Sequence, residues 1–204
     1  MRFPRHGFLV FAALVAAIAT LGVALVGGAA GGGDNQKFRW DIISVNFATG
    51  TLSAGGQASA RANDDSKITV TGSGTFVRGE ARDVTGGGTW RTFDSGGAPT
   101  GSGTYTVTGL VIFTVAPGTP PLPNDNIGNV ADNRAGLAIL RIAYSDGSRG
   151  TLVVSCHLVG TPNSVFEGIT ASKGFVDYWN REAPPPPPGN ANRTTFHVIS
   201  EDND

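Results

Sequence analysis

The chain is poor in the residues that build metal centres and disulfide frameworks. Its 204 residues include one cysteine, Cys156, and three histidines, His6, His157 and His197. A single cysteine forms no internal disulfide and supplies too few thiolates for a zinc or iron–sulfur centre. We therefore expect no metal site and no cofactor.

Charge is also scarce. Lys, Arg, Asp and Glu make up 15% of the chain, whereas roughly 25% is typical of soluble domains. The formal net charge is −1, and proteins that bind DNA or RNA present a basic stripe, so we expect no nucleic-acid partner. Because 40% of the residues are hydrophobic and the net charge is low, a wholly disordered chain is excluded as well.

Residues 1–33 are predicted to be a targeting segment. Arg2 and Arg5 precede an uncharged apolar stretch, 8–26, and small residues with a plausible cleavage site after Ala30 follow it. The stretch is long for a signal peptide and just long enough to span a bilayer as a helix. We expect a cleaved leader or a retained anchor, and in both cases an exported protein. It would be secreted, or held on the outer face of the cytoplasmic membrane with the uncleaved leader as its only membrane contact.

The rest of the chain, 34–204, alternates polar and apolar residues with a period of two. The segments with a strand pattern are 41–47, 67–71, 104–115, 137–144, 150–159, 165–179 and 194–199. Asp146-Gly147 predicts a hairpin, since both residues tolerate positive φ. No stretch has a convincing helical period. We therefore predict one all-β domain, an antiparallel β-barrel, with a β-sandwich as the alternative.

A Thr-Gly-small-Gly-Thr-aromatic motif occurs three times. The copies are residues 71–76, 85–90 and 100–105. Their spacing is about that of one strand and its turn, so we expect them at equivalent positions on successive β elements. Glycine there permits a bulge, or an aromatic ring that lies over bare backbone. The alternative is a glycine-lined rim that admits a ligand.

Two segments interrupt the β pattern. Residues 116–136 are rich in Pro, Asn and Asp, and an irregular loop of this length is often functional. It is expected to cover one mouth of the barrel. Its oxygens would suit calcium, but their spacing does not match an EF-hand loop. The five prolines of 184–188 form a stiff linker that is expected to deliver the last strand, which closes the sheet.

Few residues offer chemistry. Cys156 and His157 are adjacent, but neighbouring side chains in a strand point to opposite faces, and Cys156 shares its face with aliphatic residues. We expect Cys156 in the core. Glu167 is in phase with apolar neighbours, so it lies at a solvent-facing edge or faces a cavity with a raised pKa. The same alternatives apply to Asp177. Glu167 and His157 are the catalytic candidates.

Two short stretches resemble a known family. Residues 164–169, which include Phe166-Glu167-Gly168, and residues 173–178 are similar to the late hairpin of allene oxide cyclase and dirigent barrels, which have a Phe-x-Gly turn near that point. Those families are β-barrels with an apolar ligand cavity. The resemblance implies a closed barrel rather than an open sandwich, and it transfers no catalytic residue. The chain also resembles exported bacterial proteins of unknown role.

Three functions remain open. The first is a binding module for a small apolar ligand. Its candidate ligand contacts are Phe76, Trp90, Tyr105 and Trp179. The second is a barrel enzyme of the cyclase or isomerase type that acts on an apolar substrate and needs an interior polar group such as Glu167 or His157. The third is a structural envelope protein with a filled core.

Overall fold

The computed structural model describes residues 35–185 and 191–200. The predicted leader, 1–33, and prolines 186–188 of the linker lie outside these residues. The described part of the chain is all β apart from one short 3₁₀ turn, η1 (Val130–Asp132). Within it, no helix is long and apolar enough to cross a membrane.

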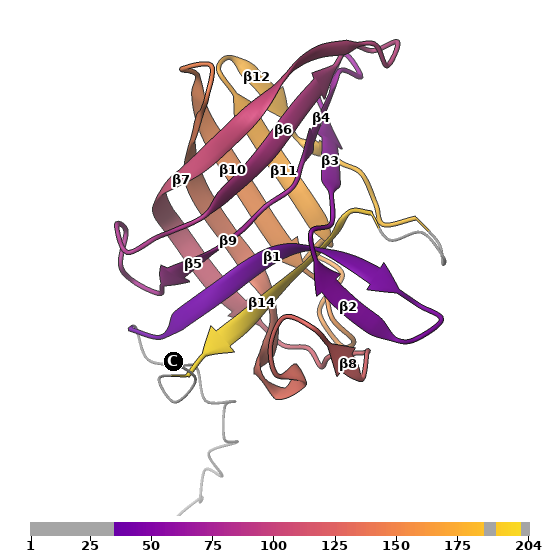
Figure 1. The fold of residues 1–204 in the computed structure, drawn as a ribbon, viewed down its shortest axis with the longest axis vertical. Helices are drawn as coiled ribbons and strands as arrows, with labels where there is room; N and C mark the ends of the chain where they lie inside the picture. Colours follow the sequence, from indigo (N-terminus) through magenta and orange to yellow (C-terminus); the bar gives the residue numbers. More distant parts are fainter. Residues whose placement is uncertain (1–34, 186–190, 201–204) are drawn as a thin grey trace, which may run out of the picture. The chain divides into compact units, whose positions relative to one another are not determined.

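The strands belong to one sheet (Figure 1). They are β1 (Lys37–Asn46), β2 (Thr51–Ala54), β3 (Ala58–Arg61), β4 (Lys67–Val70), β5 (Ser73–Val77), β6 (Gly87–Phe93), β7 (Pro99–Ala116), β8 (Asn124–Asp125), β9 (Asn133–Tyr144), β10 (Arg149–Cys156), β11 (Gly168–Lys173), β12 (Val176–Tyr178), β13 (Asn180–Arg181) and β14 (Arg193–Ile199). Every pair is antiparallel except β2 with β8. The predicted hairpin at Asp146-Gly147 is confirmed as the β9–β10 turn, with Gly147 at φ 87°.

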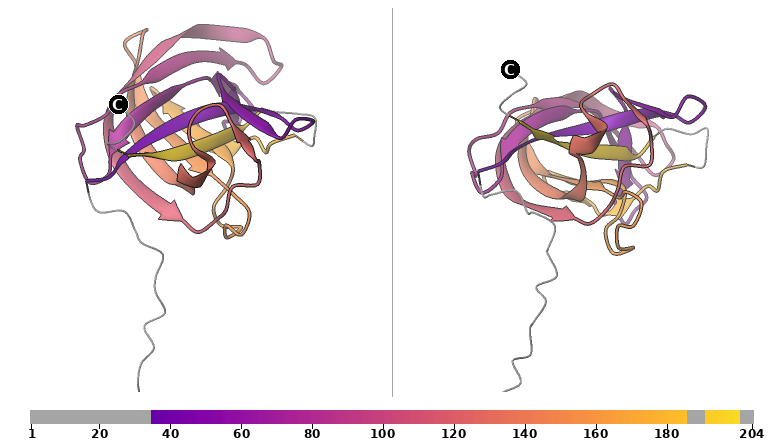
Figure 2. Two further views of the ribbon diagram at one scale, coloured as in Figure 1. Left: turned by 60° about the horizontal axis from the view of Figure 1, so that its bottom comes forward. Right: turned by 90° about the horizontal axis from the view of Figure 1, so that it is seen from below.

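Six strands close into a ring. Its order is β9, β14, β1, β5, β6 and β7, and β7 pairs back onto β9. Seen from below, the strands curl around a common axis (Figure 2). Closure leaves these strands without a free edge inside the ring. The remaining strands extend the wall, with β10, β11 and β12 continuing from β9, and β4, β3 and β13 from β6. The predicted antiparallel barrel is confirmed.

The last strand closes the ring, as the sequence pattern predicts. β14 pairs with β1 from Lys37 opposite Ile199 to Ile43 opposite Arg193. Its other edge pairs with β9, where Phe196 lies opposite Arg134. β14 is therefore the only strand of the ring that joins β1 to β9 in the described chain.

Four phenylalanine rings fill the interior at the level of β14. They are Phe38 from β1, Phe76 from β5, Phe113 from β7 and Phe196 from β14, and none is more than 5% exposed. Their ring centroids are 4.6–6.3 Å apart in stacked, tilted and edge-on pairs. These are the distances of directly packed aromatic side chains. The barrel is thus solid at this level.

The three copies of the repeated motif lie on the neighbouring strands β5, β6 and β7. Their aromatic residues, Phe76, Trp90 and Tyr105, are all buried. A Cβ atom on Gly103 would lie 3.0 Å from the indole Nε1 of Trp90, so this ring rests on bare backbone. The phenol of Tyr105 donates a hydrogen bond to the carbonyl of Thr71, 2.8 Å away. The expected equivalent positions are confirmed, and the glycines allow the rings to approach the backbone closely.

β1 is buried on both faces. Its inward side chains join the barrel core, while Ile43 and Val45 point outward and pack with Leu52 of β2 in a second, smaller core. Leu122 and Ile127, from the irregular segment between β7 and β9, cover this second core. The segment therefore lies against the outside of β1 and β2. Among the described residues, no group of three His, Cys, Asp or Glu side chains could hold a metal ion.

Candidate functional site

A pocket of about 120 Å³ lies between the outer face of β1, β2 and β14 and the irregular segments that cover it. We call it the outer-wall pocket. Its apolar lining is Ile43, Val45, Phe47, Leu52, Pro121, Leu122 and Leu158, and its polar lining is Asn133, His157, Glu167, Arg193, Thr194 and Thr195. An apolar cavity of roughly 150 Å³ holds one benzene molecule. The outer-wall pocket therefore suits a ligand about the size of one small ring.

The pairing of β1 with β14 places these groups together. Arg193 of β14 lies opposite Ile43 of β1, and Thr195 lies opposite Asp41. Side chains alternate along a strand, so Phe196 points into the barrel core while Arg193 and Thr195 line the outer pocket. The apolar outward face of β1 thereby meets the polar outward face of β14.

Glu167, in the wall of the pocket, links the residue after β10 to β14. One carboxylate oxygen accepts a hydrogen bond from the backbone N–H of His157 at 2.5 Å, and the other accepts one from the N–H of Thr194 at 2.6 Å. Burial raises the pKa of Glu167 to about 8, although the two N–H groups, Arg193 and Arg181 lower it. Each carboxylate oxygen has a second lone pair, so the group can also interact with a ligand.

Arg193 is the cation of the pocket. Its guanidinium carbon lies 4.8 Å from the ring centroid of Phe47. Its Nε atom is buried and has no hydrogen-bond partner among the described residues. Burial lowers the pKa of Arg193, and the nearby Glu167 opposes this shift, but an arginine stays charged in proteins. A buried N–H without a partner costs about 1–3 kcal/mol, which a ligand oxygen in reach of Nε would offset.

His157 presents a fixed tautomer to the pocket. Its ring Nδ1 lies 2.7 Å from the carbonyl oxygen of Val165. A carbonyl only accepts hydrogen bonds, so Nδ1 carries the proton and, in the neutral ring, Nε2 has a free lone pair. The imidazole can therefore accept a proton or a hydrogen bond at Nε2.

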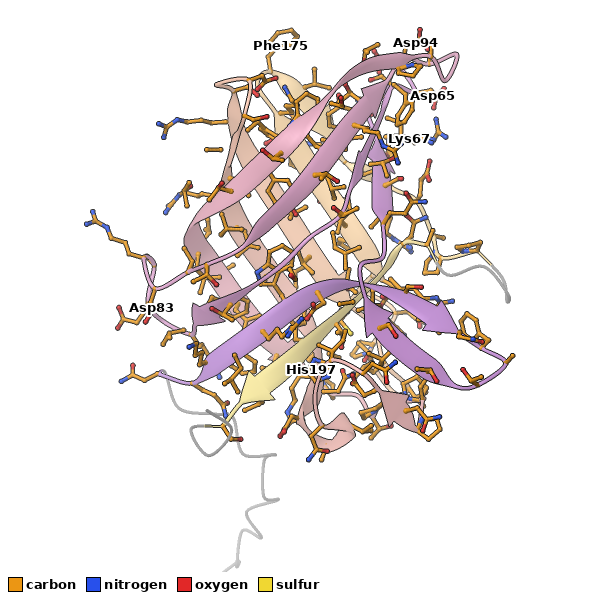
Figure 3. The ribbon with its side chains drawn as sticks, in the orientation of Figure 1. Asp65, Lys67, Asp83, Asp94, Phe175 and His197 are labelled. Carbon is orange, nitrogen blue, oxygen red and sulfur yellow. The ribbon has the colours of Figure 1, made fainter. Side chains whose placement is uncertain are left out.

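A second buried pair holds the covering segment in place. His197 Nε2 lies 2.7 Å from a carboxylate oxygen of Asp125, and both side chains are at most 3% exposed. The other oxygen of Asp125 accepts hydrogen bonds from the backbone N–H groups of Ile127 and Gly128. Figure 3 shows His197 on β14 beside this segment. The pair fixes the segment that supplies Leu122 to the pocket.

The structure brings the two catalytic candidates together. Glu167 and His157 both line the outer-wall pocket, so Glu167 faces a cavity rather than open solvent.

Cys156 is fully buried in the barrel core, as expected, and burial raises the pKa of its thiol. A thiol in that state is a poor nucleophile.

The four aromatic residues predicted to contact a ligand do not converge. Phe76, Trp90 and Tyr105 belong to the packed interior, each at most 4% exposed. Trp179 lies outside the barrel and is 72% exposed. None of the four lines the outer-wall pocket.

Sequence reasoning missed Arg193, Asn133 and Leu122. The alternation of Arg193 with Thr195 and His197 signals that these side chains share one face of the last strand. Only the register with β1 shows that this face meets Phe47 and Ile43. Asn133 and Leu122 belong to or adjoin the irregular segment, where no local pattern assigns a direction to a side chain.

The pocket can bind an anion and can exchange a proton. It combines one guanidinium, one carboxyl group with a pKa of about 8 and one oriented imidazole. It lacks an activated hydroxyl among the described residues. The Thr194 hydroxyl donates to the carbonyl of Ser155, and the Thr195 hydroxyl donates to the side-chain oxygen of Asn133. Covalent catalysis by either threonine is therefore not supported.

Comparisons of the chain with protein-family models, with curated proteins and with solved structures find no match. The similarity to allene oxide cyclase and dirigent barrels stays a prediction from the sequence. The function must therefore be inferred from the geometry of the molecule.

Proposed function

We propose that this protein binds a small, largely apolar molecule that carries one anionic group, and that the ligand occupies the outer-wall pocket. The observation that carries the proposal is the buried Nε of Arg193, which has no partner among the described residues and lies beside an apolar lining. Arg193 lines the pocket, so its guanidinium supplies a charged donor beside a hydrophobic surface.

The apolar lining supplies the affinity. Ile43, Val45, Leu52 and Leu122 come from three separate parts of the chain and surround one small space. Burial of an apolar ring against them stabilises the complex by about 25 cal/mol per Å² of apolar surface removed from water. The volume limits the ring to about the size of benzene.

The charge of the pocket selects an anion below about pH 8. In that range Glu167 is mainly protonated, so Arg193 is the uncompensated charge next to it. A ligand carboxylate can accept a charge-assisted hydrogen bond from the Nε–H of Arg193. Above pH 8 the ionised Glu167 neutralises this cation and repels the ligand, so binding weakens as the pH rises.

The test uses benzoate as the probe, with benzyl alcohol and benzylamine as the neutral and cationic comparators. In calorimetric titrations of the purified protein at pH 6, we expect benzoate to bind more tightly than either comparator, and to lose affinity at pH 9. Arg193→Gln is expected to weaken benzoate binding by about tenfold or more, the loss of one charge-assisted hydrogen bond.

The matched control is Arg91→Gln, which removes an exposed arginine from β6 that does not line the pocket. It should bind benzoate as the unaltered protein does. A second variant, Leu122→Trp, fills the pocket and should abolish binding without changing a charged group. The proposal would be overturned if Arg193→Gln bound benzoate as tightly as the unaltered protein does. It would also be overturned if the unaltered protein did not bind benzoate.

A second candidate function is proton transfer to or from an apolar substrate. The observation that favours it is Glu167, whose pKa of about 8 lies near the pH at which general acids and bases work best. Native mass spectrometry of the protein from its own source would identify a bound molecule. Incubating that molecule with the protein in D₂O then separates the two functions. An enzyme introduces deuterium at a carbon atom and loses this activity in Glu167→Gln, whereas a binding protein returns the ligand unlabelled.

A further inference from the structure

A second hollow lies on the outer face of the β9–β10–β11 sheet. Its volume is about 260 Å³, more than twice that of the outer-wall pocket, and the two share no residue. Its lining consists of Ile139, Thr151, Val153, Thr170, Ala171, Ser172, Asp177 and Trp179. Neither of the functions proposed above uses this surface.

The strand register arranges the lining in two rows. In the first row Ile139 lies opposite Val153, which lies opposite Thr170, and the chain after β12 brings Trp179 to the end of this row. The first row is mainly apolar.

The second row is polar. Ser172 lies opposite Asp177, and the hydroxyls of Thr151 and Ser172 are 3.1 Å apart. This row adjoins the first one on the same face because residues two apart in a strand point the same way. A ligand on this face therefore meets an apolar strip and a polar strip side by side.

Trp179 is the exposed tryptophan of the chain. The other two, Trp40 and Trp90, are 0% and 4% exposed, whereas Trp179 is 72% exposed. Among the described residues, nothing pairs with its indole N–H or with the carboxylate of Asp177. A large aromatic ring in water beside unpaired donors and acceptors is typical of a recognition site, because aromatic side chains combine an apolar body with a polar tip.

We infer that this hollow binds a neutral saccharide, with a pyranose ring stacked on Trp179. A pyranose presents C–H groups on one face and hydroxyl groups along its edge. The C–H face matches the indole and the aliphatic side chains, and the hydroxyl edge matches the polar row. The Asp177 carboxylate accepts hydrogen bonds from two hydroxyls, and the Thr170 hydroxyl can donate or accept.

The charge of the hollow defines the class of sugar. Its lining holds one carboxylate, Asp177, and no lysine or arginine. Arg141 extends the polar row at the end far from Asp177, opposite Thr151, so this face holds one charge of each sign and no excess cation for an acidic saccharide. A purely apolar ligand would leave the Asp177 carboxylate without a partner after its water is displaced, which is unfavourable.

The test uses the fluorescence of Trp179. Acrylamide reaches an exposed indole but not a buried one, so quenching of the protein reports mainly on this residue. The probes are cellotetraose, chitotetraose, maltotetraose and mannotetraose, each titrated to about 10 mM, a range that detects dissociation constants of about 1 mM. We expect at least one of them to protect Trp179 saturably and to shift its emission to shorter wavelength. Unchanged quenching with all four would overturn the inference.

Variants locate the site. With the saccharide that binds, calorimetry should show that Trp179→Ala lowers the affinity at least about tenfold. Trp179→Phe should lower the affinity less, and Asp177→Asn should lower it as well. Because Trp179 is exposed, its replacement should leave the melting temperature unchanged. Trp179→Ala with full affinity would overturn the assignment.

Phe175 provides the matched control. It is 99% exposed on the same β11–β12 hairpin, at the end of the molecule far from His197 (Figure 3), but it does not line the hollow. Phe175→Ala should bind the saccharide normally, and an equal loss in this variant would place the sugar elsewhere. Arg193→Gln should also bind it normally, so the outcome is independent of the ligand proposed for the outer-wall pocket.

Discussion

The interior of the barrel and its outer wall bury their side chains in different ways. Inside, the ring of Phe113 packs directly against those of Phe38 and Phe196, and the centre is filled at their level. Outside, the irregular segment does not fit β1 and β14 closely, and a space of about 120 Å³ stays open beside Glu167 and Arg193. The closed barrel is therefore packed solid at the level of these rings, and the outer-wall pocket lies between the wall and the segment that covers it.

The largest expected effect is on the free energy of unfolding, which a substitution in the interior should lower more than one in the outer wall. Phe113→Ala removes a ring from the packed interior and should lower the free energy of unfolding by about 3–5 kcal/mol. Leu122→Ala, the control, removes atoms that already border an open space, so its effect should be clearly smaller. Urea titrations of both variants test this difference. Equal losses would mean that the interior is packed no more tightly than the outer wall.

A second prediction concerns the charge buried in the outer wall. The pKa of Glu167 is about 8 in the folded protein against an ordinary value of 4.5, so the folded state binds more protons than the unfolded state between these values. Stability should therefore fall as the pH rises from about 4.5 to about 8 and then level off. The slope from this single group is at most about 1.4 kcal/mol per pH unit.

Glu167→Gln isolates this contribution because glutamine does not titrate. The difference in unfolding free energy between the unaltered protein and this variant should decrease across the same pH range. Tyr105→Phe, a change inside the barrel, serves as the control and should follow the pH dependence of the unaltered protein. Parallel curves for Glu167→Gln and the unaltered protein would show that the carboxyl group is not buried in the wall.

The smallest effect tests the polar contacts of the interior. Tyr105→Phe keeps the ring in place but removes the 2.8 Å hydrogen bond to the carbonyl of Thr71. The expected loss is about 1 kcal/mol, which is typical for one intramolecular hydrogen bond. A chemical denaturation curve of this variant is sufficient. A loss comparable to that of Phe113→Ala would indicate that hydrogen bonding, rather than ring packing, dominates the interior.

The β architecture could be predicted because its signals are local. The period of two, the Asp146-Gly147 turn and the repeated glycine motif each lie within a few residues and identify strands and hairpins directly. The last strand was also predictable, since its apolar alternation resumes after the proline run. Burial of β1 on both faces was not predictable, because it depends on a covering segment more than 70 residues away in sequence.

The candidate site could be predicted only in part. The phase of Glu167 among apolar neighbours suggested a cavity-facing carboxyl group as one of two alternatives, and the structure supports that alternative. Arg193 was missed because its contact with Phe47 depends on the register between the first and last strands. Trp179 was grouped with three aromatic residues of the interior, although it lies between β12 and β13 and is exposed. Long-range pairing, which the sequence does not encode locally, decided the surroundings of Glu167 and Arg193.

The pairing of β14 with β1 has a consequence for how the chain folds. The strand at the start of the described chain pairs with the strand at its end, so ring closure brings together residues as far apart as Lys37 and Ile199. Contacts of such sequence separation form slowly, because the loop entropy is lost before the contacts stabilise the product. During synthesis β1 can pair with β2 and β5 soon after it is made, but it lacks β14 until residues 193–199 have left the ribosome. The ring therefore closes only after translation of β14, and a permuted chain that joins these two neighbouring ends should fold faster.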